Sequence, residues 1–180
     1  MNKNKQYPWE THPHIWKTKP SFMAWLRGSL RKSVWDMYPV KLQYKNDNVK
    51  PPPLDYKGKA KSGAYCAISG EWLNKSKLQV DHIKGNISLK EWDDIMPFLE
   101  HLLLCHDNLQ LVTPTAHKIK SYAEQNGLTY EEAEIEKVYI IPFKKLCAVD
   151  QKHILRGEHN KDLTTQDKRV MVYRQSIKEK

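Results

Sequence analysis

The chain has no long run of apolar residues and few cysteines, and each shortage argues against a class of protein. No apolar stretch approaches the roughly 20 residues of a membrane-spanning helix, and the first residues are not followed by the apolar segment of a secretion signal. The three cysteines, Cys66, Cys105 and Cys147, are an odd number at wide spacing, which disfavours a disulfide framework. We therefore expect a cytoplasmic protein that neither spans a membrane nor is exported.

The composition is that of a folded, water-soluble chain. Hydrophobic residues make up 39% of the 180 residues and charged residues 28%. Such a chain buries a modest core and is not expected to be disordered. Its length allows one domain with additional arms, or two small units.

The net charge of +9 is concentrated at the start of the chain. Residues 1–60 hold 12 Lys and Arg against 4 Asp and Glu, whereas residues 61–128 hold 7 against 8 and residues 129–180 hold 11 against 9. A basic segment beside a nearly neutral one suits a polyanion that the first binds and the second acts upon. The alternative interpretation is that the lysines of residues 1–60 only keep the surface soluble. Aromatic residues interleaved with these charges favour binding of a polyanion instead.

The first third of the sequence predicts an arm with one helix. Residues 1–19 show little periodicity and read as an irregular basic arm, whereas the apolar residues of 21–37 recur at helical spacing. Residues 39–45 alternate between apolar and polar side chains, which predicts a short strand. The three prolines of residues 51–53 form a semi-rigid linker and are the best candidate for a boundary.

The middle of the chain predicts a hairpin and then a helix. Residues 64–83 are typical of a β-hairpin whose second strand is residues 78–82. Ser88 and Glu91 have the spacing of a capping box, which predicts a helix that ends near Leu104.

The rest of the chain predicts a short apolar segment and further helices. Residues 108–112 are the apolar segment, and a helix begins with Pro114 in its first turn. Thr129 starts another helix with capping-box spacing, which we expect Pro142 to end. Residues 166–176 fit either a helix or a strand.

Four polar residues stand at the borders of these predicted elements. Asp81 and His82 end a strand, and Asn108 opens the next apolar segment. His117 belongs to the first turn of the following helix. Hydrolysis of a phosphodiester needs an aligned water, a base and positive charge on the phosphate. Imidazole titrates near neutrality, so His82 suits the base.

The other three polar residues suit supporting roles. Asp81 and His117 offer the oxygen and nitrogen that a divalent metal ion takes. Neighbouring strand residues point to opposite faces, so Asp81 and His82 share one site only if the strand ends or bends there. The amide of Asn108 either holds the other ring nitrogen of His82 or braces the loop.

These segments resemble those of the HNH endonucleases, the ββα-metal group, and are most similar to its phage-encoded homing endonucleases. The resemblance rests on Asp81–Ile83, Asn108–Leu111 and His117–Ser121 and covers residues 64–122. It implies an α+β fold in which a hairpin and a helix bind one divalent ion, Mg²⁺ in the first place, with Mn²⁺ or another transition metal left open. It also implies a phage-encoded enzyme in the cytoplasm of a bacterial host.

The resemblance implies a role for each of the four residues. His82 would activate water, while Asp81 and His117 would bind the metal ion. Asn108 would support the base or join the ligands of the metal.

The sequence departs from many members of that family in its cysteines. They carry two Cys-x-x-Cys pairs that bind a structural zinc ion. Here the first pair reads Cys66 to Ser69 and the second Thr113 to Ala116. One thiol remains where a tetrahedral sulfur site takes four. We therefore predict no structural zinc.

The flanks predict contacts with double-stranded DNA. A site that addresses phosphate reads little sequence, so sequence choice must come from elsewhere in the chain. Tryptophan and tyrosine alternate with Lys and Arg in residues 1–50, and such arms lie in grooves, stack on bases and neutralise phosphates. The predicted contacts are Lys17, Lys19, Arg27, Arg31, Lys32, Lys118 and Lys120.

By function, the chain divides into three segments. Residues 1–53 are a basic, aromatic-rich DNA-binding arm with one helix, and residues 54–128 are the HNH nuclease domain. Residues 129–180 are a helical and polar C-terminal region that is a second candidate for a DNA-binding module. One site cuts one strand, so cleavage of both strands requires a homodimer or a second engagement.

Alternatives stay open for the function and for a metal site. A site-specific homing endonuclease is preferred over a restriction-type or packaging-type HNH nuclease, which would cut at other targets. A non-catalytic basic DNA-binding protein is the third candidate, against which the intact set of polar residues argues. His101 and His106 flank Cys105 and could form a His/Cys metal cluster, although the predicted helix and loop account for both.

Overall fold

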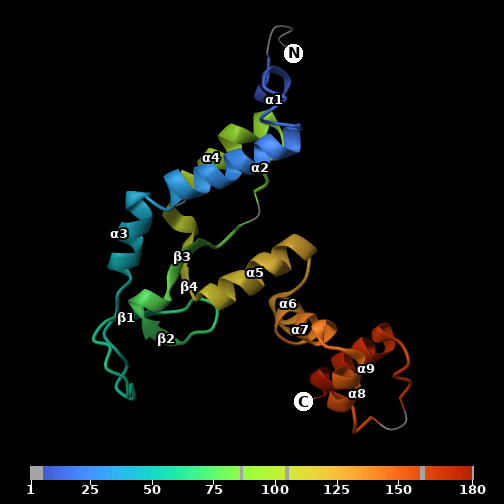
Figure 1. Cartoon of the computed structure of the whole chain (residues 1–180). Coiled ribbons are helices and arrows are strands. Elements are labelled where there is room, and N and C mark those ends of the chain that lie inside the picture. The colour runs from blue at the N-terminus through green and yellow to red at the C-terminus, as the bar shows by residue number, and fades with distance from the viewer. Residues whose placement is uncertain (1–5, 86, 104–105, 159–160, 180) are drawn as a thin grey trace. The chain divides into compact units, whose positions relative to one another are not determined.

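The computed structural model describes residues 6–85, 87–103, 106–158 and 161–179, and the chain divides into two compact units. The first unit is Met1–Pro114 and the second is Thr115–Lys180. Both contain helices, and the first also holds two small antiparallel sheets, which confirms a mixed α and β fold (Figure 1). In the described ranges, no helix combines the length and the apolar character needed to cross a lipid bilayer.

A long helical segment lies in the predicted arm. α2 (Lys19–Leu30) is capped by Thr18, whose hydroxyl oxygen accepts a hydrogen bond from a first-turn N–H at 3.3 Å. It continues directly as the π-helix η1 (Arg31–Trp35). The helix predicted over residues 21–37 is therefore confirmed.

The strand predicted over residues 39–45 is wrong, because this segment is the helix α3 (Pro39–Asp47). Proline is well tolerated at the first helical position, where its missing N–H has no helical partner to lose. Contacts with the rest of the unit hold the helix: the Tyr44 hydroxyl donates to the Leu109 carbonyl at 2.7 Å. An alternation over seven residues is too short to distinguish a strand from a helix that is fixed by such contacts.

A β-hairpin is present, but its second strand is not the predicted one. β1 (Gly63–Tyr65) pairs with β2 (Trp72–Asn74), so the chain returns directly after the turn. Gly70 in this turn has φ +67°, a left-handed conformation that side-chain-bearing residues rarely adopt. Residues 78–82 belong instead to a second sheet.

The second sheet joins two strands that are far apart in the sequence. β3 (Gln79–His82) pairs antiparallel with β4 (Leu109–Val112), with Val80 opposite Leu111. The Ala67 N–H donates to the Leu111 carbonyl at 2.8 Å and so ties the first hairpin to this sheet. The apolar segment predicted at residues 108–112 is thus a strand.

The connection between β3 and β4 carries the next helix. α4 (Ile95–Leu103) follows the single turn η3 (Trp92–Asp94). The Asp94 carboxylate accepts two backbone N–H groups at 2.8 and 2.9 Å and caps the segment. The predicted start at Ser88 is therefore too early, and the predicted end at Leu104 lies outside the described residues.

The core of the first unit lies between α2 and α4, which run side by side (Figure 1). Its buried residues are Phe22, Met23, Leu89, Phe98 and Leu102. Trp9, in the short helix α1 (Pro8–Thr11), and Trp16 pack against it, with the Trp9 ring 5.6 Å from that of Phe22. Residues 6–19 of the expected irregular arm therefore cover the core of the first unit.

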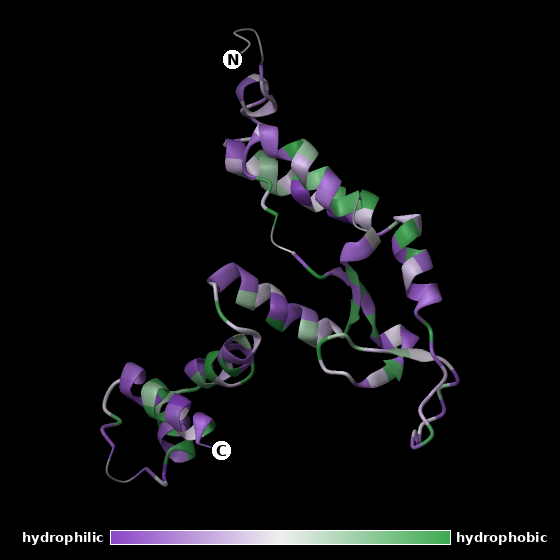
Figure 2. Ribbon diagram, turned by 180° about the vertical axis from the view of Figure 1, so that it is seen from behind, coloured by the Kyte–Doolittle hydropathy of each residue, from purple (hydrophilic) through white to green (hydrophobic). Residues whose placement is uncertain are grey.

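The second unit consists of helices. α5 (Pro114–Asn126) ends before Gly127, whose φ is +63°. The helical segments that follow are α6 (Tyr130–Glu134), the π-helix η5 (Ile135–Ile140), α7 (Ile141–Lys145), α8 (Ala148–Ile154) and α9 (Gln166–Lys178). Hydrophobic and hydrophilic residues mix along these helices (Figure 2).

Of the features predicted for this unit, the helix start at Thr129 is right and the helix end at Pro142 is wrong. The capping box at Thr129 is confirmed, since its hydroxyl oxygen accepts from the Glu132 N–H at 3.2 Å. The expectation that Pro142 ends the helix is wrong. Pro142 lies in the first turn of α7, after a π-helical turn that accommodates its missing N–H. The segment at 166–176 is helical.

The core of the second unit includes a buried charge. Its apolar residues are Ile140, Phe143, Leu155, Val170 and Val172. Arg169 is buried beside them and donates from Nε to Gln151 Oε1 at 2.6 Å and from one terminal nitrogen to the carbonyls of Leu163 and Thr164. Gln151 in turn donates to the Phe143 and Leu146 carbonyls at 2.9 and 3.1 Å.

Candidate active site

Asp81 and His82 are the last two residues of β3, as the sequence predicted. In the ladder, Asp81 lies opposite Gln110 and His82 opposite Leu109. The Gln110 amide donates to Asp81 Oδ2 at 3.1 Å. The chain bends at residues 83–84, directly after the strand. Asp81 and His82 are thus carried to the tip of a short strand, the condition under which both can serve one site.

The imidazole of His82 is packed between two other rings. The centre of the Trp35 ring lies 4.4 Å away with an interplanar angle of 30°, and that of the His101 ring lies 4.8 Å away at 29°. Only 8% of His82 is exposed, as is 8% of Asp81. The two rings restrict the orientation of the imidazole and cover most of its surface.

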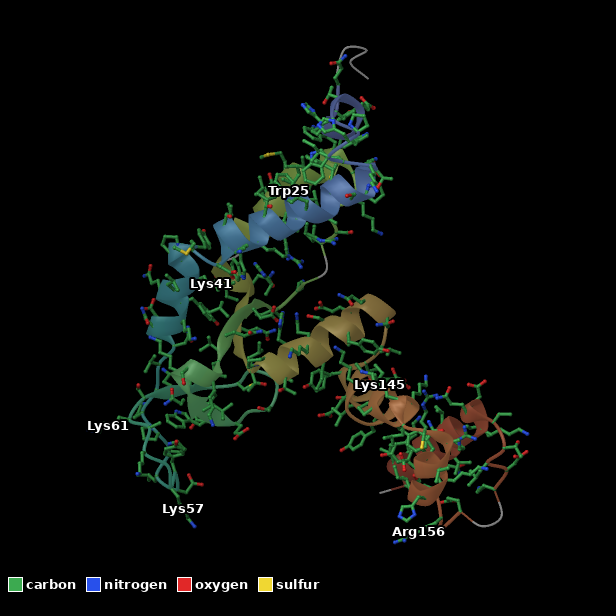
Figure 3. The ribbon with its side chains drawn as sticks, in the orientation of Figure 1. Trp25, Lys41, Lys57, Lys61, Lys145 and Arg156 are labelled. Carbon is green, nitrogen blue, oxygen red and sulfur yellow. The ribbon has the colours of Figure 1, made fainter. Side chains whose placement is uncertain are left out.

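Trp35 itself is held on its other side by a cation. Lys41 Nζ, on α3, lies 4.8 Å from the centre of the Trp35 ring and binds Asp36 Oδ1 at 3.1 Å (Figure 3). Cation–π contacts of this kind contribute about 0.5–1 kcal/mol at exposed sites. The end of η1 is therefore fixed beside His82.

Asn108 braces the loop that follows β3. Its Oδ1 accepts from the Lys84 N–H at 2.8 Å, and its Nδ2 donates to the Lys84 carbonyl at 3.1 Å. The Asn108 carbonyl also accepts from the Ile83 N–H at 2.8 Å. Of the two roles that the sequence left open for this amide, the geometry matches the bracing of the loop.

Cys66 lies with Ser69 and Thr113, two residues at positions where the resemblance would place zinc ligands. Cys66 is buried, and the Ser69 side chain and the backbones of Ile68, Ser69 and Thr113 lie within hydrogen-bonding reach of it. Burial opposes ionisation of the thiol, but these hydrogen bonds outweigh it and lower the pKa of Cys66. Ser69 and Thr113 therefore meet Cys66 as hydrogen-bonding partners.

α3 supports the sheet from outside. Lys45 Nζ donates to the Leu78 carbonyl at 2.5 Å, just before β3. Burial, with Lys75 and Lys41 nearby, lowers the pKa of Lys45. Burial also raises the pKa of Tyr44, so its hydroxyl keeps the proton that it donates to Leu109. Both ends of the β3–β4 ladder are thus anchored to a helix of the predicted arm.

His117 belongs to the second unit, in the first turn of α5, whereas Asp81, His82 and Asn108 belong to the first. His117 is partly exposed and Lys118 is exposed. Lys120 is mostly covered and binds Glu124 Oε1 at 2.8 Å, one turn along the helix. The charge of Lys120 is therefore engaged within α5.

The predicted DNA contacts of the first unit differ in how their charges are used. Lys19 forms an ion pair with Glu91. The Arg31 guanidinium lies over the Phe98 ring, 5.9 Å from its centre. Arg27 is half-buried, whereas Lys17 and Lys32 are exposed. The tryptophans expected to stack on bases mostly pack in the core instead, and Trp25 is the exposed one, at 51% (Figure 3).

Sequence reasoning missed the residues that surround His82 and Asp81. The sequence predicts Trp35 only as one of the aromatic residues of the arm. It predicts His101 only as part of a helix or of a metal cluster with Cys105, and Cys105 lies outside the described residues. A signal for Gln110 existed, because it is the one polar residue of the apolar strand 109–112. Nothing in the sequence signals Trp35, which reaches His82 across 47 positions.

The structure also shows which side chains lie close enough together to bind a metal ion. Within the ranges that the structure describes, no three His, Cys, Asp or Glu side chains are grouped so as to bind one ion. The described residues thus do not supply a complete set of protein ligands. The divalent ion expected from the sequence stays a prediction.

Comparisons with known proteins found no match to this chain. No family model matches the chain, and no curated protein or solved structure matches it significantly.

Proposed function

We propose that the chain is an HNH-type DNA endonuclease, and that it hydrolyses phosphodiester bonds of double-stranded DNA as a site-specific homing enzyme. The observation that carries this proposal is the end of β3. Asp81 and His82 end a strand that is paired with β4, and Asn108, the residue before β4, holds the loop that follows them. This is the order of residues on which the sequence resemblance rests.

In this proposal His82 is the general base that takes a proton from the attacking water. An imidazole suits this step near neutral pH. Its orientation is set by the Trp35 and His101 rings, and its strand end is set by the amide of Asn108. Water must reach a ring that is 8% exposed, so the base role requires a movement of one neighbouring ring.

Asp81 and His117 are the residues that we propose to hold a divalent ion. A bound ion would stabilise negative charge on the phosphate. Mg²⁺ in proteins is commonly bound by one or two carboxylates together with water and substrate phosphates. The carboxylate of Asp81 thus suits Mg²⁺ or Mn²⁺, whereas the imidazole of His117 suits a transition metal ion better.

One observation favours a second function, that of a non-catalytic DNA-binding protein. The close packing of His82 against Trp35 and His101 is also what a histidine with a purely structural role would show. The formal net charge of +9 suits binding of a polyanion with or without cleavage.

A plasmid-cleavage assay with Mg²⁺ or Mn²⁺, and with EDTA as a control, separates the two functions. We expect cleavage with metal ion and none with EDTA. His82→Ala should lower the rate by about 10²–10⁴, as loss of general-base catalysis does, while DNA binding is kept. His153→Ala, at an exposed histidine of α8, is the matched control and should leave the rate unchanged. Cleavage by the His82 variant at the parental rate would remove the assignment.

The same assay addresses the biology and the number of subunits. Nicked plasmid alone indicates one cut by one chain, whereas linear plasmid indicates a homodimer or a second engagement. A single long recognition site supports homing, and frequent short sites support a restriction-type enzyme.

A further inference from the structure

The segment between α3 and β1 is a loop whose two ends are fastened together. The Lys50 N–H donates to the Gly63 carbonyl at 2.7 Å, and the Gly63 N–H donates to the Lys50 carbonyl at 3.1 Å. Residues 51–62 therefore form a closed loop on the first unit, next to the first hairpin (Figure 1). Compact surface loops whose ends meet in this way often have a function.

The interior of this loop is stiffened at several points. Its first three residues are prolines, which fix φ and favour extended backbone. The Tyr56 N–H closes a turn onto the Pro53 carbonyl at 3.0 Å, and the Tyr56 ring packs edge-on against Trp72 with 4.6 Å between ring centres. Gly58 allows this ring to lie close, because a Cβ there would stand 2.2 Å from the Tyr56 hydroxyl. The loop thus loses little conformational entropy when it binds a partner.

The exposed charged side chains of the loop are mainly basic. Lys57, Lys59 and Lys61 are all exposed, and Asp55 is the one acidic residue of residues 51–62. In the part of the chain that the structure describes, no ion pair joins any of the three lysines to a carboxylate. Figure 3 shows Lys57 at the far end of the loop and Lys61 nearer its base. Their charges are available to an external anion, unlike those of Lys19 and Lys120.

The loop is coupled to the strands of the candidate site. It leads into β1, and two residues after the end of that strand the Ala67 N–H donates to the Leu111 carbonyl on β4. Leu111 pairs with Val80, the residue before Asp81. The loop is therefore linked, through the first hairpin, to the second sheet, which carries the site.

We propose that residues 51–62 are a preformed grip on the phosphate backbone of duplex DNA, with Lys57, Lys59 and Lys61 as its contacts. The proposal rests on the proposed function in that both take duplex DNA as the partner. Its three lysines lie outside the predicted arm of residues 1–53 and outside the HNH motifs. Contacts with phosphate carry no base information, so the grip fixes position and not sequence.

Salt-dependent binding tests the grip without cleavage. Fluorescence anisotropy of a labelled, mixed-sequence duplex is measured in EDTA over a series of salt concentrations, for the full chain and for Lys57→Gln/Lys59→Gln/Lys61→Gln. Each phosphate contact contributes about 0.9 to the slope of log K against log salt. We expect the slope of the triple variant to be smaller by about two to three.

A control with the same loss of charge separates contact from net charge. Lys75→Gln/Lys77→Gln/Lys90→Gln removes three lysines of the first unit that lie outside the loop and are not among the predicted contacts, and we expect a change in slope below about one. The grip is refuted if the loop variant keeps the parental slope, or if both triple variants change it equally. Absence of DNA binding by the parent would overturn both proposals, whereas binding without metal-dependent cleavage would overturn only the nuclease.

Discussion

The side-chain amide of Asn108 binds both backbone polar groups of Lys84, accepting from its N–H at 2.8 Å and donating to its carbonyl at 3.1 Å. Only Ile83 lies between His82 and Lys84, so this pair of hydrogen bonds determines how the chain leaves the candidate base. An amide is the side chain that offers a donor and an acceptor side by side.

Asn108→Ala should therefore lower both stability and cleavage. Two hydrogen bonds are lost and two backbone groups lose their partner, which costs about 1–3 kcal/mol in the free energy of unfolding. Asn108→Asp keeps the acceptor and loses the donor, so we expect an intermediate effect. Urea denaturation and plasmid cleavage measure the two quantities. Asn126→Ala, which loses one bond to the Tyr122 carbonyl on an exposed part of α5, is the control. Unchanged cleavage by the folded Asn108→Ala protein would show that the brace is not needed for activity.

Phe98→Ala should destabilise the first unit by about 3–5 kcal/mol, the usual cost of removing a buried phenylalanine. Phe98 is 2% exposed in the core between α2 and α4. Tryptophan fluorescence follows the transition, because Trp9, Trp16 and Trp92 pack around that core. Met96→Ala on the same helix, at a residue that is 61% exposed, should change stability by less than about 0.5 kcal/mol. Equal losses for the two variants would contradict the packing of α4.

Asp94 should make the stability of the first unit depend on pH in the acid range. Hydrogen bonds from the backbones of Glu91 and then Lys90 lower its pKa. A lowered pKa stabilises the fold above the pKa of the unfolded chain, about 3.9 for Asp. This contribution is lost as the pH falls through the lower value of the folded state.

Asp94→Asn should therefore unfold at lower urea concentration than the parent at pH 7, and the difference should shrink below about pH 4. Asp93→Asn removes the same charge from the same exposed turn without the capping bonds and serves as the control. A difference that stays constant from neutral to acid pH would mean that the Asp94 charge does not contribute.

Gln151→Leu should cost about 2–3 kcal/mol, because it removes the acceptor of a buried, charged donor. Arg169 Nε donates to Gln151 Oε1 at 2.6 Å, and both residues are buried. The double variant Gln151→Leu/Arg169→Met removes the charge as well and should regain part of the loss, as replacements of buried ionic groups by apolar ones often do. Thermal unfolding followed by circular dichroism measures the series, with Gln175→Leu at an exposed position of α9 as the control. A double variant less stable than the single one would show that Arg169 contributes through its other bonds.

Local features of the fold were predictable from the sequence, and non-local ones were not. The helix at α2 and the cap at Thr129 depend on spacings within a few residues. The pairing of β3 with β4, and of β1 with the three-residue strand β2, depends on contacts between distant segments. An alternation of residues cannot name the partner strand, and the hairpin was therefore assigned to the wrong return strand.

The candidate site shows the same division. Asp81 and His82 at a strand end, with Asn108 opening the next strand, follow from the order of residues. The ring of Trp35 against His82 does not, because η1 is brought there by the packing of helices. The two roles that the sequence allowed for Asn108 are distinguished only by coordinates.

The long connection between β3 and β4 has a consequence for the order of folding. The ladder joins His82 to Leu109 and Gln79 to Val112, positions 27 and 33 residues apart. Closing so large a loop costs entropy before any ladder bond forms, which slows folding relative to local helices. Docking of α4 on α2 orders the middle of the connection and so reduces the length of free chain that must close. Changes in the α2–α4 core should therefore alter the rate at which the strand end carrying Asp81 and His82 is assembled, and a newly made chain acquires this ladder only after residue 112 has been synthesised.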